Sequence, residues 1–249
     1  MSRGSSPVLV VGGGSGIGRG CAEVLAERGW TVANADLRRP DRLPGGTAEF
    51  YEVDIRDHDA VEVMVSAAEA DLGPVNACVC AAGTARVTGV LDISPKEWDL
   101  IIGVNLTGTF NVLRATTRRM VERGGGSFVA ISSVDGDDPV AGLGHYCASK
   151  AGVDSLVRVA ALELGQSGVR VNSVAPGVVE TPLMKPMFER EGVREDFLEH
   201  IPLGRTGRPS DIATAVSFML SDDAAYVTGQ SLKVDGGMSL REHARLLPE

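Results

Sequence analysis

The sequence predicts an α/β fold: a doubly wound, parallel seven-stranded sheet with helices on both faces. Short apolar, β-branched segments alternate with stretches of helical periodicity, as in parallel sheets that are covered on both sides. The chain has 249 residues, 43% of them hydrophobic, and no Pro/Ser-rich linker, repeat or low-complexity block divides it. We therefore expect a single domain over residues 1–249 with a substantial core. The expected strands lie at residues 8–11, 31–35, 48–53, 75–81, 127–132, 169–175 and 231–234.

The first expected strand runs directly into a glycine-rich turn that contains Gly12, Gly16 and Gly18. Glycines let a backbone turn tightly and approach a pyrophosphate closely. The helix expected at 17–28 would offer unpaired N–H groups and the positive end of its dipole to phosphates. A second apolar strand then ends at Asp36, at the spacing typical of dinucleotide-binding proteins. This segment predicts a nucleotide site.

Proton-transfer chemistry is indicated by Tyr146 and Lys150, which lie one helical turn apart in the segment HYCASK. An apolar repeat that includes Val159 and Leu162 predicts a helix over residues 146–164, so both side chains would share one face. A free tyrosine has a pKa of about 10, and a nearby ammonium stabilises the phenolate and lowers that value. Ser133 follows the buried strand expected at 127–132 and could hydrogen-bond a substrate oxygen. The three residues together predict proton exchange with an alcohol or a carbonyl.

With these motifs the chain resembles the single-domain, Rossmann-like members of the short-chain dehydrogenase/reductase superfamily over nearly its whole length. Other matching positions are Asn105 in VNLTG, Asp54 after the third strand, Pro176-Gly177 followed by Thr181, and VDGG at the last strand. The helix before Asn105 is expected to begin with Ser94 as N-cap, a proline in its first turn and a capping glutamate.

The resemblance implies a catalytic set of Ser133, Tyr146, Lys150 and Asn105. Tyr146 would be the acid/base and Ser133 would polarise the substrate oxygen. Lys150 would lower the tyrosine pKa and hold the nicotinamide ribose, while Asn105 would kink its helix and seat a proton-relaying water. The cofactor would contact Gly12, Gly14, Ser15, Gly16, Ile17, Gly18, Asp36, Leu37, Asp54, Ile55, Ala81, Ala82, Gly83, Asn105, Tyr146, Lys150, Pro176, Gly177, Val179 and Thr181.

Two places depart from the family pattern. Val11 stands where threonine is usual, and the Asn-Asn-Ala-Gly motif at the end of the fourth strand has become Cys80-Ala81-Ala82-Gly83. In the family these places face each other. There they tie the first and fourth strands together. If the hydrogen bond that is lost here joined two side chains, its replacement by two apolar groups could leave stability nearly unchanged. If the threonine instead satisfied a backbone amide, that amide needs another partner.

The preferred cofactor is expected to be NAD rather than NADP, because Asp36 can accept hydrogen bonds from ribose hydroxyls and would repel a 2′-phosphate. Arg38 and Arg39 are expected to point to solvent or to pair with Asp41. A competing interpretation is an NADPH-dependent 3-oxoacyl-thioester reductase, which would favour a basic residue at Ser15 or Leu37. Another is a catalytically silent nucleotide-binding regulator. A nucleotide-sugar epimerase would normally need a longer C-terminal domain.

The substrate is expected to be a secondary alcohol/ketone pair, beneath a lid near residues 182–208 that contains methionines and a phenylalanine. Asp135, Asp137 and Asp138 could bind a polyol or a cation, but a solvated surface turn is the favoured interpretation. Arg86 could face an acidic substrate. His145 is interpreted as a pocket-wall or surface residue rather than a catalytic one.

The net charge of −9 argues against nucleic acid and anionic membrane partners. No signal peptide or membrane-spanning run is visible, because the stretch before the first strand, residues 1–7, is short and polar. A cytoplasmic enzyme is therefore expected. The four cysteines lack metal-ligand spacing and are expected to be reduced core thiols, with no metal site. The helices expected at 94–123 and 146–166 carry much apolar surface, and the family packs the equivalent pair about a two-fold axis. A homotetramer is therefore expected, with the last strand and its tail at a second interface.

Overall fold

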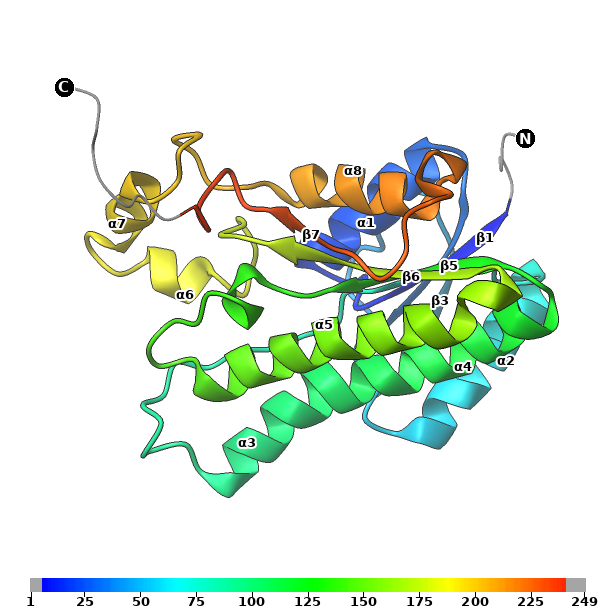
Figure 1. Ribbon diagram of the computed structural model, residues 1–249, viewed down its shortest axis with the longest axis horizontal. Coiled ribbons are helices and arrows are strands. Elements are labelled where there is room, and N and C mark those ends of the chain that lie inside the picture. Colours follow the sequence, from blue (N-terminus) through cyan, green and yellow to red (C-terminus); the bar gives the residue numbers. More distant parts are fainter. Residues whose placement is uncertain (1–5, 241–249) are drawn as a thin grey trace.

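The computed structural model describes residues 6–240, which form one seven-stranded parallel sheet with helices on both faces (Figure 1). The strand order, β3-β2-β1-β4-β5-β6-β7, confirms the predicted fold class. Each expected strand is present to within two residues at either end. The N-terminal polar stretch and most of the C-terminal tail lie outside the described residues. The strands are β1 (Pro7–Val11), β2 (Thr31–Asp36), β3 (Thr47–Glu52), β4 (Ala77–Cys80), β5 (Gly126–Ile131), β6 (Val169–Pro176) and β7 (Ser231–Val234).

The helices divide between the two faces of the sheet. Figure 1 shows α2 (His58–Leu72), α4 (Thr109–Glu122) and α5 (Gly144–Leu164) on one face and α1 (Gly16–Glu27) and α8 (Pro209–Leu220) on the other. α3 (Pro95–Ile102) leads into α4 through a π-helix at Gly103–Gly108. The short helices α6 (Lys185–Phe188) and α7 (Val193–Glu199) lie beyond the carboxyl ends of the strands.

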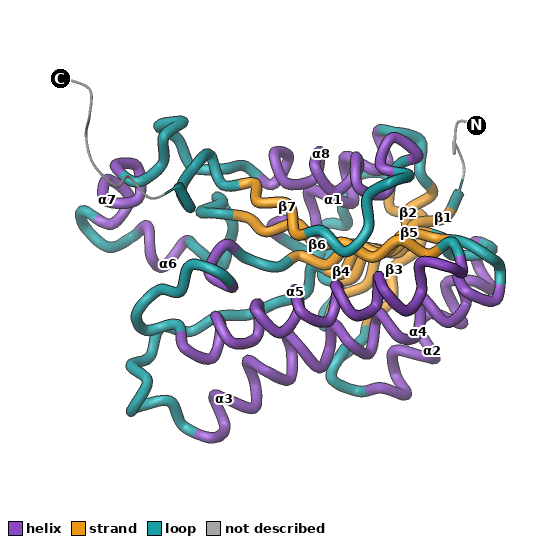
Figure 2. Tube along the Cα trace, viewed as in Figure 1, coloured by secondary structure: helices purple, strands orange, loops and turns teal. Residues whose placement is uncertain are grey.

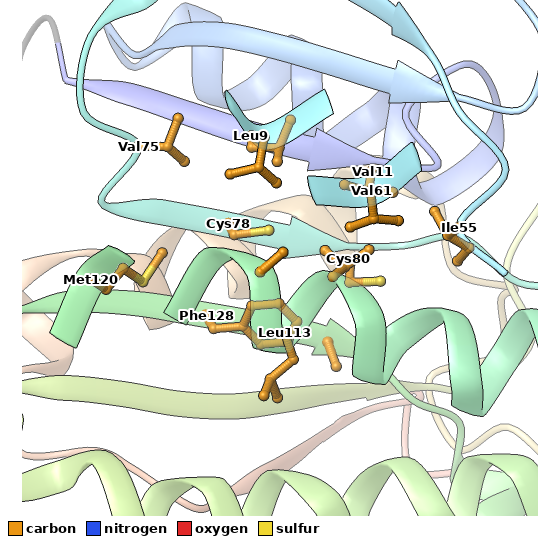
Figure 3. Close-up of a cluster of buried hydrophobic side chains, with 14 of the residues drawn as sticks. Leu9, Val11, Ile55, Val61, Val75, Cys78, Cys80, Leu113, Met120 and Phe128 are labelled. Carbon is orange, nitrogen blue, oxygen red and sulfur yellow. The ribbon is translucent and has the colours of Figure 1, made fainter. Parts of the chain in front are cut away.

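The core has two halves because successive side chains of a strand point to opposite faces of the sheet. Leu9 and Val11 pack toward α2, α4 and α5, whereas Val8 and Val10 pack toward α1 and α8. Figure 3 shows the first of these clusters, with Phe128 near its centre. Burying one such side chain contributes about 1.5–3 kcal/mol, which fixes the strand ends that carry the site.

Two sequence expectations need correction. The third strand was expected to be buried, but β3 lies at the sheet edge and is partly exposed, which explains its polar sequence TAEFYE. In α5 the buried stripe contains Val153 and Val157, whereas Val159 and Leu162 are exposed although both were counted in the apolar repeat.

The four cysteines are buried and unpaired. Among residues 6–240, no cluster of histidine, cysteine or acidic side chains could hold a metal ion. Within the same range, none of the helices has the length and apolarity needed to cross a membrane.

Candidate active site

The candidate site lies at the carboxyl edge of the sheet. Figure 2 shows that the loops after β5 and β6 leave the sheet at the end where α6 and α7 lie. In open α/β sheets, ligands bind in the crevice outside this edge, where the strand order reverses. Here the order reverses between β1 and β4.

The glycine-rich turn fills the space between β1 and β4. Gly12 has φ +80°, and a Cβ added there would collide with the main chain of Ala82. A Cβ on Gly18 would collide with the carbonyl oxygen of Gly12. Only glycine fits at these two positions, because the turn packs against the main chain after β4 and against itself.

The departures at Val11 and Ala81 are accommodated by main-chain bonding. The Ala81 N–H donates to the Val11 carbonyl oxygen at 2.7 Å, so the first and fourth strands remain joined at this point. Both strand ends are otherwise packed in the apolar core. The Ala81 amide therefore has a main-chain partner.

The start of α1 and the end of β2 form a cradle that fits a dinucleotide. The side chain of Ser15, the N-cap of α1, makes no capping hydrogen bond, and the first turn carries no acidic residue. Its N–H groups are therefore suited to an anion. The Asp36 carboxylate accepts hydrogen bonds from the N–H groups of Gly14 at 2.8 Å and of Leu37 at 2.7 Å. Asp36 thus stands beside the glycine turn, as predicted.

Asp54 and Ile55, both expected to contact the cofactor, are fixed by neighbouring side chains. Asp54 forms an ion pair with Arg56, with 2.5 Å between Oδ2 and Nη2, and this hydrogen-bonded arginine lowers the pKa of Asp54. Ile55 is buried against Gly108, where a Cβ would lie 2.5 Å from the Ile55 side chain. The Asn111 amide donates to the Ile55 carbonyl oxygen at 2.9 Å and fixes this loop; sequence reasoning missed Asn111.

Tyr146, Ser133 and Lys150 are brought together, as the sequence predicts. Ser133 leaves the end of β5 and is hydrogen-bonded to the Tyr146 side chain. Lys150 is buried; its Nζ lies 5.6 Å from the centroid of the Tyr146 ring and donates to the Ile131 carbonyl oxygen at 2.8 Å. The ammonium is thus directed between the end of β5 and the tyrosine.

The ionisation of this group differs from the sequence expectation. Burial raises the pKa of Tyr146 to about 12, although the hydrogen bond from Ser133 opposes that shift. Burial also lowers the pKa of Lys150 to about 8. The predicted depression of the tyrosine pKa is therefore wrong for the chain alone, because loss of hydration outweighs the hydrogen bond from Ser133. At neutral pH Tyr146 is a phenol that can donate a proton.

Asn105 lies in the π-helix and is fully buried. Its Nδ2 donates to the Thr84 carbonyl oxygen at 2.9 Å and to Ser149 Oγ at 3.0 Å, while its Oδ1 accepts from the Thr84 N–H at 2.8 Å. The expected break in helical regularity is present, and π-turns are frequent at functional sites. A Cβ on neighbouring Gly83 would lie 3.5 Å from both Asn105 Oδ1 and Lys150 Nζ, so the main chain after β4 closes on this group.

Asp154 is a buried residue of the site that sequence reasoning missed. It accepts hydrogen bonds from Ser132 Oγ at 2.8 Å and from Ser173 Oγ at 2.6 Å, and its charge opposes the lowering of the Lys150 pKa. The available signal was an acidic residue four positions after Lys150, on the same helix face.

The Pro176-Gly177 segment returns to the glycine turn. The Gly177 N–H donates to the Val234 carbonyl oxygen at 3.2 Å, and Val179 pairs with Gly207 in an isolated bridge. A Cβ on Gly16 would lie 3.4 Å from the Thr181 side chain, so Thr181 neighbours the phosphate cradle.

The segment expected to be a lid is built around Phe188. Its ring meets Phe197 edge-on, and the Arg194 guanidinium lies 4.6 Å from its centroid. Glu180 binds Arg194 at 3.1 Å and Thr206 at 2.9 Å, which ties both ends of the segment together. Glu180, Arg194 and Thr206 border a cavity of about 270 Å³.

The three aspartates after Ser133 have two different roles. Asp137 and Asp138 pair with Lys233 at 3.5 and 2.9 Å, in keeping with the favoured surface turn. Asp135 is partly buried and hydrogen-bonded to Ser133, so the surface interpretation is wrong for this residue. Its charge raises the pKa of Tyr146.

The comparisons with known proteins agree with this geometry. Residues 12–239 match the protein family described as enoyl-(acyl carrier protein) reductase. The chain is 38% identical to (3R)-3-hydroxyacyl-CoA dehydrogenase of Rattus norvegicus, with 94% of this chain and 96% of that protein covered. It is 36% identical to a 3-oxoacyl-acyl-carrier-protein reductase of Thermotoga maritima, with 92% and 96% covered. A solved short-chain type dehydrogenase/reductase from Mycobacterium ulcerans superposes with a TM-score of 0.91 at 36% identity, with 97% of this chain and 92% of that chain covered.

The fold and the site thus define a nicotinamide-dependent oxidoreductase that acts on CH–OH groups. The chain belongs to the short-chain dehydrogenase/reductase family.

Proposed function

We propose that this enzyme interconverts a secondary alcohol and a ketone, with NAD preferred over NADP. The observation that carries the proposal is the convergence of Ser133, Tyr146 and Lys150 at the edge of the sheet, next to the cradle of Gly12 and Asp36. When bound, the nicotinamide supplies or accepts the hydride. A screen of secondary alcohols and ketones with both dinucleotides, followed at the nicotinamide absorbance band, tests the proposal. Absence of turnover across these substrates would contradict it.

In this proposal the chain orients the reactants and moves one proton. Ser133 holds the substrate oxygen, and the Tyr146 hydroxyl gives that oxygen a proton during reduction or removes one during oxidation. Lys150 is near enough to stabilise the phenolate and to bind a ribose hydroxyl. Asn105 fixes the loop at Thr84 and the helix at Ser149, and in this proposal it also seats a proton-relaying water. The segment near 182–208 closes over the substrate.

A second candidate is reduction of 3-oxoacyl thioesters with NADPH, because close relatives are named for that chemistry or for its reverse. Ser15 and Leu37, where a basic residue would assist a 2′-phosphate, are both uncharged. The same assay with 3-oxoacyl thioesters separates the candidates.

We expect at least about a tenfold preference for NAD in kcat/KM, or about 1.4 kcal/mol. The Asp36 carboxylate lies beside the glycine turn, and a 2′-phosphate bound next to it would meet a like charge. Arg39, expected to point to solvent or to pair with Asp41, is exposed, and its guanidinium carbon lies 5.3 Å from the Phe50 ring centroid. Asp36→Ala combined with Leu37→Arg should narrow or invert the preference, whereas Asp41→Ala should leave it unchanged. Equal kcat/KM values for the unmodified enzyme would contradict the role of Asp36.

Asp135→Asn should move the pH profile of alcohol oxidation to lower pH. The Asp135 charge raises the pKa of Tyr146, so its removal lowers that pKa and the phenolate forms at lower pH. The matched variant Asp137→Asn removes an exposed carboxylate that pairs with Lys233, and it should leave the profile in place. Profiles that do not differ between Asp135→Asn and the unmodified enzyme would refute this coupling.

The proposal also includes a cytosolic homotetramer. The outer surfaces of the α3–α4 and α5 helices expose Trp98, Phe110 and Leu162, apolar side chains that a partner subunit would cover.

A further inference from the structure

His145 lies beside Tyr146 but does not line an open surface. Its side chain is fully buried, which corrects the expectation of a pocket-wall or surface residue. The ring makes two hydrogen bonds: Nδ1 with the Tyr146 N–H at 3.0 Å and Nε2 with Glu97 Oε1 at 3.0 Å.

These two partners determine the protonation state of the ring. A backbone N–H can only donate, so Nδ1 must be unprotonated and accept. The Glu97 carboxylate accepts, so Nε2 carries the proton. His145 is therefore a neutral imidazole in the Nε2–H form, and its orientation is fixed by Glu97.

Glu97 is itself held in place. Its Oε1 also accepts from Thr88 Oγ1 at 2.6 Å, and its N–H is capped by Ser94 Oγ at 3.2 Å. These hydrogen bonds from Thr88 and His145 lower the pKa of Glu97, which keeps it an acceptor. Thr88 also donates its N–H to the Gly142 carbonyl oxygen at 2.8 Å, just before α5. The chain between β4 and α3 is thus connected to the start of the catalytic helix.

The main chain of Tyr146 is held on both sides. Leu143, the N-cap of α5, provides no side-chain cap, so the His145 ring takes over one orphan N–H of the first turn. On the other side, the Tyr146 carbonyl oxygen accepts from Ser149 Oγ at 2.7 Å, and Ser149 in turn accepts from Asn105.

We propose that His145 is a positioning residue, which through Nδ1 fixes the backbone of Tyr146 and thereby places the phenol against the substrate oxygen. This inference rests on the proposed role of Tyr146. Displacement of a reacting group by about 1 Å can lower the rate of the chemical step by about 10²-fold. His145 itself is not among the residues expected to contact the dinucleotide. Loss of His145 should therefore affect kcat and leave the Kd of the dinucleotide unchanged.

Three substitutions separate the two hydrogen bonds. His145→Asn places an amide oxygen near the Nδ1 position and retains an acceptor for the Tyr146 N–H. His145→Gln places an amide near the Nε2 position and retains only the link to Glu97. His145→Leu removes both hydrogen bonds, to the Tyr146 N–H and to Glu97. The control is His58→Asn, which changes a histidine on α2 that contacts Arg114.

The measurements are kcat and the dinucleotide Kd, with kcat normalised to the binding sites found by dinucleotide titration. We expect His145→Asn to keep kcat within about threefold, and His145→Gln and His145→Leu to lose about tenfold or more, equivalent to about 1.4 kcal/mol. Normalised kcat values that stay at the unmodified level in all three variants would overturn the inference. So would equal losses in His145→Asn and His145→Gln. Failure of the proposed function itself is distinguishable, because Tyr146→Phe would then retain turnover.

Discussion

Tyr146→Phe should reduce kcat by at least about 10³-fold while leaving dinucleotide binding within a few-fold of the unmodified enzyme. The substitution removes one hydroxyl and little volume, so the ring packing near Lys150 is kept. That hydroxyl is the only proton donor proposed for the substrate oxygen, and positioned acid–base groups contribute about 10²–10⁴-fold. Steady-state kinetics on the best substrate of the screen, with dinucleotide binding followed by fluorescence, measures both quantities.

The control is Tyr226→Phe, which makes the same chemical change at a fully exposed position. Its kcat should equal that of the unmodified enzyme. Comparable turnover in Tyr146→Phe and Tyr226→Phe would remove Tyr146 from the mechanism and, with it, the proposed function.

The charge states of the site indicate how the two directions of the reaction respond to pH. Tyr146 has a pKa of about 12 in the chain alone and is protonated at neutral pH, as carbonyl reduction requires. Alcohol oxidation needs the phenolate, whose population increases with pH. The neighbouring Asp135 charge raises the pKa of Tyr146, so it favours the protonated phenol that reduction needs and disfavours the phenolate that oxidation needs.

The fold was predictable because local signals and topology agree. Apolar runs such as Val8–Val11 mark strands buried on both faces, and the glycine turn is required by contacts that only glycine permits. Tyr146 and Lys150 were predictable because helical periodicity alone brings them to one face.

Other features of the site depend on tertiary contacts that leave little trace in the sequence. Asp154, Ser149 and His145 act through partners on other elements or through packing, and each reads as an ordinary helix residue when taken alone. The pKa of Tyr146 was predicted in the wrong direction because spacing reports the nearby ammonium but not the loss of hydration. The different roles of Asp135 and Asp137 depend on how the chain turns after β5.

Lys150→Met should abolish most of the activity without destabilising the protein. Methionine has a similar length, but it removes the ammonium that contacts the tyrosine ring and the Ile131 carbonyl oxygen. We expect kcat to fall by about 10²-fold or more, as for other groups that assist proton transfer. Dinucleotide binding should weaken by about tenfold, since hydrogen bonds to charged groups contribute about 1.5–3 kcal/mol. Lys96→Met, at an exposed position of α3, should change neither quantity.

Lys150→Met should lower the activity but not the free energy of unfolding. Burial lowers the pKa of Lys150 from 10.5 to about 8. The unfolded chain therefore binds more protons than the folded one between these values, and this linkage reduces the free energy of unfolding by up to about 3 kcal/mol below pH 8. The penalty shrinks as pH rises from 8 to 10.5, because the unfolded chain also loses the proton. Denaturant titrations at pH 7 should thus show Lys150→Met to be at least as stable as the unmodified protein, with the difference shrinking towards pH 10.5. A variant that loses stability at pH 7 would show that partners of the ammonium offset the cost of its burial. A variant that keeps full kcat would show that Lys150 has no role in catalysis.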